Sequence, residues 1–273
     1  IESNKSKGGK VLGLDTGFEE LNKLTFGFQK GELIILAARP AVGKSALALN
    51  LAEKACTISK AHVAFFSLEM GIDQLTMRLF SSLSGLTLDK VRSGRLSSTE
   101  MATLLAAKSS VDRMNLYLDE AMNNNLSDIK AKCLRLKREN KLDFIIIDYL
   151  QLIHVPDFKG NRTEEVGRVS RGLKTLAREL EVPVLALSQL SRLAEQSERP
   201  SLSHLRESGS IEQDADIVMF LHREHGGGDQ EAMKKLRNHK TELIIAKNRQ
   251  GATDTVELMF KGAQSTFNSI SQS

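Results

Sequence analysis

The segment that most constrains the fold is an apolar run, Leu33–Ala37, that leads into the tripeptide Gly43-Lys44-Ser45. A buried strand, then Gly-Lys-Ser, then a helical stretch is typical of a phosphate-binding loop. In such a loop, backbone N–H groups surround a phosphate, the lysine adds a point charge and the hydroxyl can ligate Mg²⁺. The usual pattern begins with glycine, whereas this chain has Ala38. The sequence therefore predicts a phosphate site with one departure from the common pattern, against the alternative of an accidental surface turn.

Strand-like and helical patterns alternate along most of the chain. Strands are expected at Leu33–Ala37, His62–Ser67, Leu116–Leu118, Phe144–Ile147 and Val184–Leu187, and helices at Ser45–Ser59, Ile72–Leu83, Ser98–Asp112, Leu126–Asn140 and Glu164–Leu180. This alternation predicts an α/β fold with a mostly parallel central sheet flanked by helices. The later strand-like segments Ile217–Leu221, Leu243–Lys247 and Thr255–Phe260 have short connections and predict antiparallel C-terminal strands at one edge. The segments Asp157–Arg162 and Arg223–Lys240 are polar and are predicted to be mobile loops.

Composition excludes several classes of protein. The chain is 41% hydrophobic and 26% charged, which is ordinary for a soluble globular protein, and its net charge of +4 permits nucleic-acid binding without arguing for it. No apolar run reaches the length of a membrane span, and nothing resembles a secretory signal. The two cysteines, Cys56 and Cys133, are expected to be buried reduced thiols of a cytosolic protein. Residues 1–12 are expected to be a linker remnant, followed by one domain over 13–273 and preceded by a domain that this chain lacks.

Three polar residues follow predicted buried strands and form the candidate chemistry: Asp148, Glu69 and Gln189. Asp148 can hold Mg²⁺, directly or through water, as the carboxylate of a Walker B motif, or it can be a helix cap. Glu69 can polarise the water that attacks a γ-phosphate, or it can be a carboxylate favoured by a helix N-terminus. Gln189 can contact a γ-phosphate and respond to its loss, or it can cap a turn.

Two cationic features remain open on the residues alone. Lys247 and Arg249 end a predicted strand and could face their own nucleotide, reach a neighbouring subunit's nucleotide as an arginine finger does, or be a solvated strand end. The loop containing Arg206, Glu207 and Gly209 suits contact with DNA phosphates, or is an ordinary loop. The basic segment Lys130–Lys141 is predicted to be a solvated helix face in preference to a DNA-binding one.

Seven motifs in this order resemble the RecA-like motor domain of the DnaB family of replicative helicases. They are Gly17-Phe-Glu-Glu-Leu21, Ala37–Ser45, Phe66–Met70, Ile146–Leu152, Ala186–Arg192, Leu205–Asp216 and Lys247–Arg249. The resemblance covers about Leu14 to Phe260, and the family commonly has Ala-Arg-Pro where this chain has Ala38-Arg39-Pro40. It implies a RecA-like P-loop NTPase fold.

The resemblance also implies a role for each site residue. Phosphate and nucleotide contacts would come from Ala38, Arg39, Pro40, Ala41, Val42, Gly43, Lys44, Ser45 and Ala46, with Arg78 packed on the adenine. Ser45 and Asp148 would hold Mg²⁺, Glu69 would be the catalytic base, and Gln189 would sense the γ-phosphate. Lys247 and Arg249 would act in trans on the adjacent subunit's nucleotide. Arg206, Glu207 and Gly209 would follow single-stranded DNA inside the ring.

The function implied is that of an ATP-dependent 5′→3′ replicative DNA helicase, a homo-hexamer that uses ATP and Mg²⁺ on single-stranded or forked DNA. Primase and a helicase loader are the expected partners, with no membrane, in the cytoplasm and at the nucleoid of a bacterium or in a phage system. Two other functions remain open. One is a RecA-like strand-exchange or clock-type ATPase, and the other is a helicase paralogue that loads or regulates other helicases.

Overall fold

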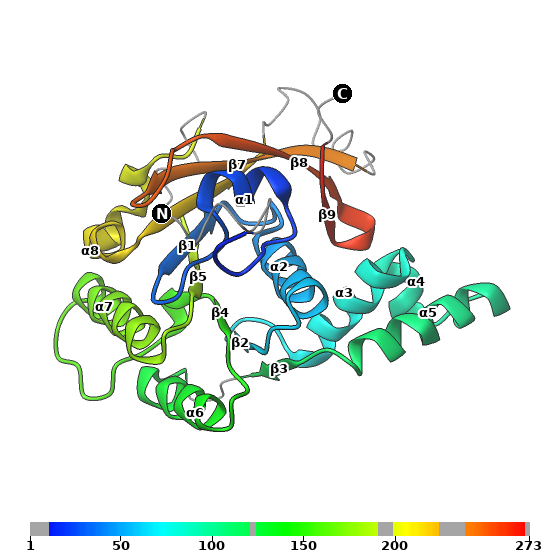
Figure 1. Ribbon diagram of the computed structural model, residues 1–273, viewed down its shortest axis with the longest axis horizontal. Helices are drawn as coiled ribbons and strands as arrows, with labels where there is room; N and C mark the ends of the chain where they lie inside the picture. The colour runs from blue at the N-terminus through cyan, green and yellow to red at the C-terminus, as the bar shows by residue number, and fades with distance from the viewer. Residues whose placement is uncertain (1–10, 121–123, 191–198, 224–237, 271–273) are drawn as a thin grey trace, which may run out of the picture.

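The fold is built around one mixed sheet (Figure 1). The computed structural model describes residues 11–120, 124–190, 199–223 and 238–270, with backbone alone at 206–208. The described residues form a nine-stranded sheet in the order β3-β2-β4-β5-β1-β6-β7-β8-β9. Helices cover both of its faces, as the sequence predicts.

Six neighbouring strands are parallel to one another. They are β1 (Leu33–Ala38), β2 (Val63–Ser67), β3 (Leu116–Asp119), β4 (Phe144–Asp148), β5 (Val184–Gln189) and β6 (Ile217–His222). Five of them come from apolar runs that are buried throughout or nearly so, as expected for parallel strands covered on both faces. β1 lies between β5 and β6, so the connections from β1 and β5 leave in different directions and open a crevice at the carboxyl edge.

Three antiparallel strands extend the sheet beyond β6. They are β7 (Asn238–Asn248), β8 (Thr255–Lys261) and β9 (Thr266–Ser269). The prediction of antiparallel C-terminal strands is confirmed. The prediction of a loop through Lys240 is wrong at its C-terminal end, because Asn238–Lys240 pairs with β8 as part of β7. These residues are polar and show no apolar alternation, so the sequence does not indicate a strand. Their pairing with β8 makes them one. The rest of that predicted loop, 224–237, lies outside the described residues.

The helices divide into two layers, each with its own apolar core. One layer holds α1 (Glu19–Thr25), α2 (Lys44–Ile58), α3 (Ile72–Ser84), α4 (Leu88–Ser93) and α5 (Ser98–Val111). The other holds α6 (Leu126–Arg138), α7 (Arg162–Leu180) and α8 (Gly209–Asp214), which lie on the opposite side of β1, β4 and β5 in Figure 1. The predicted helices are confirmed, while α1, α4 and β9 are short elements that the sequence patterns missed.

The cysteines are buried thiols, as predicted, and two lysines of the basic helix α6 form ion pairs within the chain. Cys56 and Cys133 are free and buried, and burial raises the pKa of each thiol to about 12. On α6, Lys130 pairs with Glu179 at 2.7 Å and Lys132 pairs with Asp119 at 2.7 Å, so these charges are matched within the chain. Among the described residues, no helix has the length and apolarity needed to cross a membrane.

Asn50 ties the last strand to the helix that follows the phosphate loop. Its Oδ1 accepts a 2.8 Å hydrogen bond from the Phe267 backbone N–H, and both residues are buried. We expect Asn50→Ala to lower the free energy of unfolding by about 1–3 kcal/mol, because a buried N–H loses its acceptor. Chemical denaturation measures this loss. The exposed Asn115→Ala is the control and should change stability by less than about 0.5 kcal/mol; equal effects of both variants would contradict the prediction.

Candidate functional site

The loop between β1 and α2 has the backbone that a phosphate cradle needs. Gly43 has φ 110°, a conformation that side chains rarely adopt, and Ala41 has φ 63°. A Cβ added to Gly43 would lie 3.1 Å from Phe267 Cζ, so the backbone conformation requires glycine and the space beside it is tight. Ala38 is the last residue of β1, buried and paired in register with Gln189 and Leu221. Alanine therefore suits the position where the common pattern has glycine.

Lys44, Ser45 and Asp148 meet at the start of α2 and the end of β4. The Lys44 ammonium lies 4.7 Å from the centre of the Tyr149 ring and 3.4 Å from the Ser188 carbonyl oxygen, to which it donates. Burial lowers the pKa of Lys44, while the nearby Asp148 and Glu69 carboxylates act to raise it. The two carboxylates therefore oppose the effect of burial on the Lys44 ammonium.

Asp148 is fully buried, and neither of its carboxylate oxygens accepts a hydrogen bond from the described residues. Burial raises its pKa, and Lys44, Ser45 and Arg78 act in the opposite direction. Buried carboxylates without hydrogen bonds are rare in folded proteins, so this one calls for a further partner. Hydroxyl and carboxylate oxygens are ligands that Mg²⁺ accepts, and Ser45 and Asp148 therefore fit that ion.

Glu69 lies on a bend that is held from both sides. The Ser67 hydroxyl donates to the Met70 carbonyl at 2.5 Å and accepts from the Met70 N–H, while the Leu68 N–H donates to the Asp148 carbonyl at 2.7 Å. These bonds fix the ends of β2 and β4 against each other and leave the Glu69 side chain exposed toward the phosphate loop. The structure therefore brings Glu69, Asp148 and Lys44 together as predicted, while their catalytic roles stay predictions.

Gln189 ends β5 beside the same loop, and a residue that sequence reasoning missed holds it there. The Gln151 side chain donates to the Ser188 hydroxyl at 2.8 Å and to the Gln189 carbonyl at 3.2 Å, and it accepts from the Gln189 N–H at 3.3 Å. The Gln189 side chain remains exposed. Gln151 lies within the Ile146–Leu152 motif, and its amide, three residues after the strand-end Asp148, is the signal in the sequence.

One cavity of about 450 Å³ is lined by Lys44, Ser45, Glu69 and Gln189, among others. Its walls combine the phosphate loop with α3, α4 and the C-terminal strands: Ala38, Arg39, Pro40, Ala41, Gly43, Lys44, Ser45, Glu69, Met70, Arg78, Leu88, Gln189, Phe260, Gly262 and Ser265. Burial lowers the pKa of the Arg78 guanidinium, while the nearby carboxylates of Asp148 and Glu69 act to raise it. The cavity therefore has a charged end at the phosphate loop and a more apolar end at Leu88 and Phe260.

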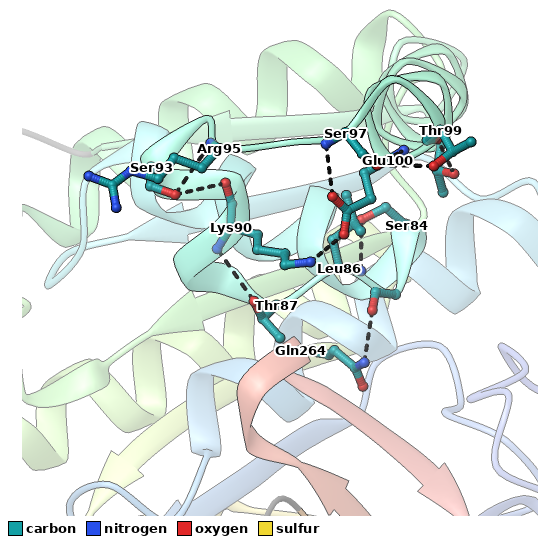
Figure 2. Close-up of polar contacts among 12 residues, drawn as sticks. Ser84, Leu86, Thr87, Lys90, Ser93, Arg95, Ser97, Thr99, Glu100 and Gln264 are labelled. Carbon is teal, nitrogen blue, oxygen red and sulfur yellow. Dashed lines mark hydrogen bonds and ion pairs between the residues drawn. The ribbon is translucent and has the colours of Figure 1, made fainter.

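The apolar end is supported by a network at the corner between α3 and α5 (Figure 2). Gln264, from the C-terminal part of the chain, donates to the Gly85 carbonyl at 2.8 Å. Lys90 pairs with Glu100, whose carboxylate also accepts from the Ser97 N–H at 2.9 Å in a capping box. Because Leu88 lies within this corner, the network fixes one wall of the cavity.

Arg223 is a second residue that the sequence reasoning did not assign. Its guanidinium donates to the Val42 carbonyl at 2.9 Å and lies 5.4 Å from the Phe260 ring centre. It follows β6 directly, so a cation after a buried strand was the signal, but its segment was predicted to be a loop. The structure instead places Arg223 against the back of the phosphate loop.

Lys247 and Arg249 lie at the opposite edge of the sheet. Lys247 pairs in register with Val218 near the start of β6, and the Arg249 N–H donates to the Asp216 carbonyl at 2.9 Å. The Asp216 N–H donates to the Leu33 carbonyl, so Asp216 lies beside the start of β1. The strand rises over five residues from Leu33 to Ala38, so about 17 Å separate this edge of the sheet from the phosphate loop. The possibility that these cations face their own nucleotide is therefore wrong; the subunit border and the solvated strand end remain.

The predicted DNA loop lies on the same side of the fold as this cation pair. The 3₁₀ segment Leu202–Ser208 runs directly into α8, which begins at the exposed Gly209. A Cβ on Gly209 would meet nothing within 4 Å among the described atoms. The side chains of Arg206 and Glu207 lie outside the described part of the structure, as do residues 191 and 192 of the Ala186–Arg192 motif. Contact with DNA remains a prediction for this loop.

Comparison with known proteins identifies relatives over nearly the whole chain. Residues 13–269 match the family described as the DnaB-like helicase C terminal domain. The replicative DNA helicase DnaB of Geobacillus stearothermophilus is 48% identical over 95% of this chain and 57% of its own length, and that of Leifsonia xyli is 45% identical over 98% and 58%. The chain thus spans less than three fifths of these curated relatives.

Solved structures give the same picture. The ATPase domain of G40P superposes with a TM-score of 0.90 at 36% identity, covering 99% of this chain and 95% of that one. A DnaB-like replicative helicase, described with its interactions with primase, superposes with a TM-score of 0.89 at 35% identity, covering 99% and 65%. The RecA-like fold with antiparallel C-terminal strands is therefore confirmed.

Gly43 and Ala41 of the phosphate loop both have a positive φ, and we expect different responses to their substitution. Gly43→Ala should destabilise the fold by about 1–3 kcal/mol and abolish nucleotide binding, because the new side chain meets an unfavourable φ and the Phe267 ring. Ala41→Gly replaces an alanine of positive φ by a residue that adopts this conformation freely, so its free energy of unfolding should stay within about 1 kcal/mol of wild type. Thermal unfolding and titration with a fluorescent nucleotide measure both; normal binding by Gly43→Ala would contradict the cradle.

Proposed function

The chain belongs to the family of DnaB-like helicase C-terminal domains, and from this premise we propose that it is the motor of an ATP-dependent 5′→3′ replicative DNA helicase. The observation that carries the proposal is the buried Asp148, which faces Lys44 and accepts no hydrogen bond from the part of the chain that the structure describes. A buried carboxylate that lacks hydrogen bonds lowers the stability of the fold. A role for Asp148 in binding a nucleotide and its metal ion explains why the carboxylate is kept there. ATP with Mg²⁺ is the ligand that these residues fit.

The residues of one protomer divide the chemistry among them. The loop amides and Lys44 bind the phosphates, and Arg78 lies against the nucleotide at the side of the cavity formed by α3. Bound Mg²⁺ supplies charge neutralisation at the phosphate oxygens, and Ser45 and Asp148 would hold it. Glu69 orients the attacking water and accepts its proton, a contribution of about 10²–10⁴ in rate. Gln189, held by Gln151, contacts the γ-phosphate and loses that contact after hydrolysis.

The remaining cations act between protomers. Lys247 and Arg249 lie about 17 Å from their own phosphate loop, and 46% of the Arg249 side chain is exposed. We therefore assign them to the nucleotide of an adjacent subunit, which requires a ring, and a homo-hexamer is the assembly proposed. An arginine supplied in this way contributes about 10³–10⁵ in turnover.

Single-stranded or forked DNA is the proposed track. Arg206, Glu207 and Gly209 would contact its phosphates, and contacts with the backbone need no base-reading side chains. We propose residues 13–273 as the motor domain and 1–12 as part of a linker to a primase-interacting domain. Primase and a loader are the proposed partners, and the bacterial or phage cytoplasm, at the nucleoid, is the proposed location.

Unwinding by the full-length protein tests this function. With ATP and Mg²⁺ it should separate a forked duplex that has a free 5′ tail, and Lys44→Ala should abolish unwinding because the phosphate loop loses its point charge. Strand exchange without unwinding would favour a RecA-like strand-exchange protein. A protein that only stimulates another helicase would be a loader or regulator, and normal turnover by Lys44→Ala would contradict the phosphate loop.

Action between subunits has its own prediction. Arg249→Ala should retain nucleotide binding and lose most hydrolysis, about 10³-fold, since the phosphate loop is intact. Adding Lys44→Ala subunits, which cannot hydrolyse ATP but still carry Arg249, should restore part of the activity in mixed rings. ATP turnover measured across mixing ratios gives the result. Absence of restoration at every ratio would contradict action in trans.

A further inference from the structure

The carboxyl end of α8 is bonded by the two cations of the β7 end. The last carbonyls of a helix have no partner within it, and α8 is only six residues long. Lys247 Nζ donates to the Glu212 carbonyl at 2.5 Å, and the Arg249 guanidinium donates to the Gln213 carbonyl. Cations at a helix C-terminus also interact favourably with the helix dipole. Both candidate trans-acting residues therefore touch the same helix end.

The Asp216 carboxylate also contacts Arg249. Its carboxylate accepts from the Leu33 N–H at 2.8 Å, pairs with Lys174 at 2.5 Å and lies 3.4 Å from the Arg249 guanidinium. Asp216 is 7% exposed, so its position is set by β1 and α7 and does not depend on solvent. Arg249 is thus oriented by a rigid carboxylate and by a helix end, while nearly half of its side chain stays exposed.

The backbone between the two cations is fixed to a different element. The Asn248 side chain donates to the Leu24 carbonyl of α1 at 2.9 Å, and a Cβ on Gly251 would lie 2.4 Å from that oxygen. The cation turn therefore stays with α1 and the sheet. A displacement of α8 would change the side-chain orientation of Lys247 and Arg249 without moving their backbone.

The opposite end of α8 is the predicted DNA loop, since the helix begins at Gly209 directly after Arg206 and Glu207. We propose that α8 and Asp216 position Lys247 and Arg249, so that DNA bound at the start of α8 controls how these cations meet the neighbouring subunit's nucleotide. This inference rests on the proposed function, because it assumes DNA contact at the loop and action in trans. Such a coupling is reciprocal, so the nucleotide state of one subunit also alters DNA affinity at its neighbour's α8.

Asp216→Asn in the full-length protein tests the positioning role. It removes the negative charge beside Arg249 and keeps the size of the side chain. Asp119→Asn is the matched control, because Asp119 is also a buried aspartate that pairs with a lysine, Lys132, at 2.7 Å, and it lies on the distant edge strand β3. ATP turnover is measured with and without poly(dT), together with KM for ATP and the solution mass of the ring.

For Asp216→Asn we expect the stimulation by poly(dT) to fall about tenfold, with KM and ring mass unchanged. Asp119→Asn should retain the stimulation, and Asp216→Glu should restore part of it. Full stimulation in Asp216→Asn, or an equal loss in Asp119→Asn, would overturn the inference. If Arg249→Ala activity is restored in mixed rings while Asp216→Asn keeps full stimulation, the coupling fails and the trans site stands. No restoration would mean instead that the action in trans assumed in the proposed function fails.

Hydrogen exchange tests the coupling on the wild-type protein, without any substitution. Adding poly(dT) should change exchange at the amides of α8, while the amides of residues 249–251 stay unchanged because α1 and the sheet hold that turn. Unchanged exchange throughout α8 would overturn the coupling.

Discussion

The pairing of β1 between β5 and β6 is the constraint on which the rest of the structure depends. It brings together three strands that are far apart in the sequence and sets Ala38, Gln189 and Leu221 at one level of the sheet. The phosphate loop leaves from that level toward α2. At the other end of the same strand, Leu33 bonds Asp216, which orients Arg249. One strand thus fixes a nucleotide site at its carboxyl end and a cation pair at its amino end.

The electrostatics of the site are established before any ligand binds. Asp148 is buried without a hydrogen bond, Lys44 is held between carboxylates, and the bends at Glu69 and Gln189 are bonded in place. Such preorganisation means that the reacting groups need little rearrangement during catalysis. It also costs stability, since the buried Asp148 is only partly compensated by Lys44 and Arg78. Nucleotide binding should therefore stabilise the fold.

Much of this arrangement could be predicted from the sequence, because strand-end polar residues of parallel strands converge at one edge. Asp148, Glu69 and Gln189 are predictable in this way, and Lys44 is predictable from the Gly-Lys-Ser pattern that follows a buried strand. Gln151 and Arg223 were missed because their roles depend on hydrogen bonds to backbone atoms of distant segments. The start of β7 was missed because its polar residues become a strand only through pairing with β8. Whether Lys247 and Arg249 face their own nucleotide could be decided only from strand register.

The contact between Gly43 and the Phe267 ring has a consequence for the order in which the protein matures. The aromatic pair Phe260 and Phe267, whose ring centres are 4.4 Å apart, forms the floor beneath the phosphate loop. A chain still on the ribosome has synthesised Lys44 long before either ring exists. The aromatic support beneath the cradle is therefore complete only when the last strand, β9, has been synthesised and has paired with β8.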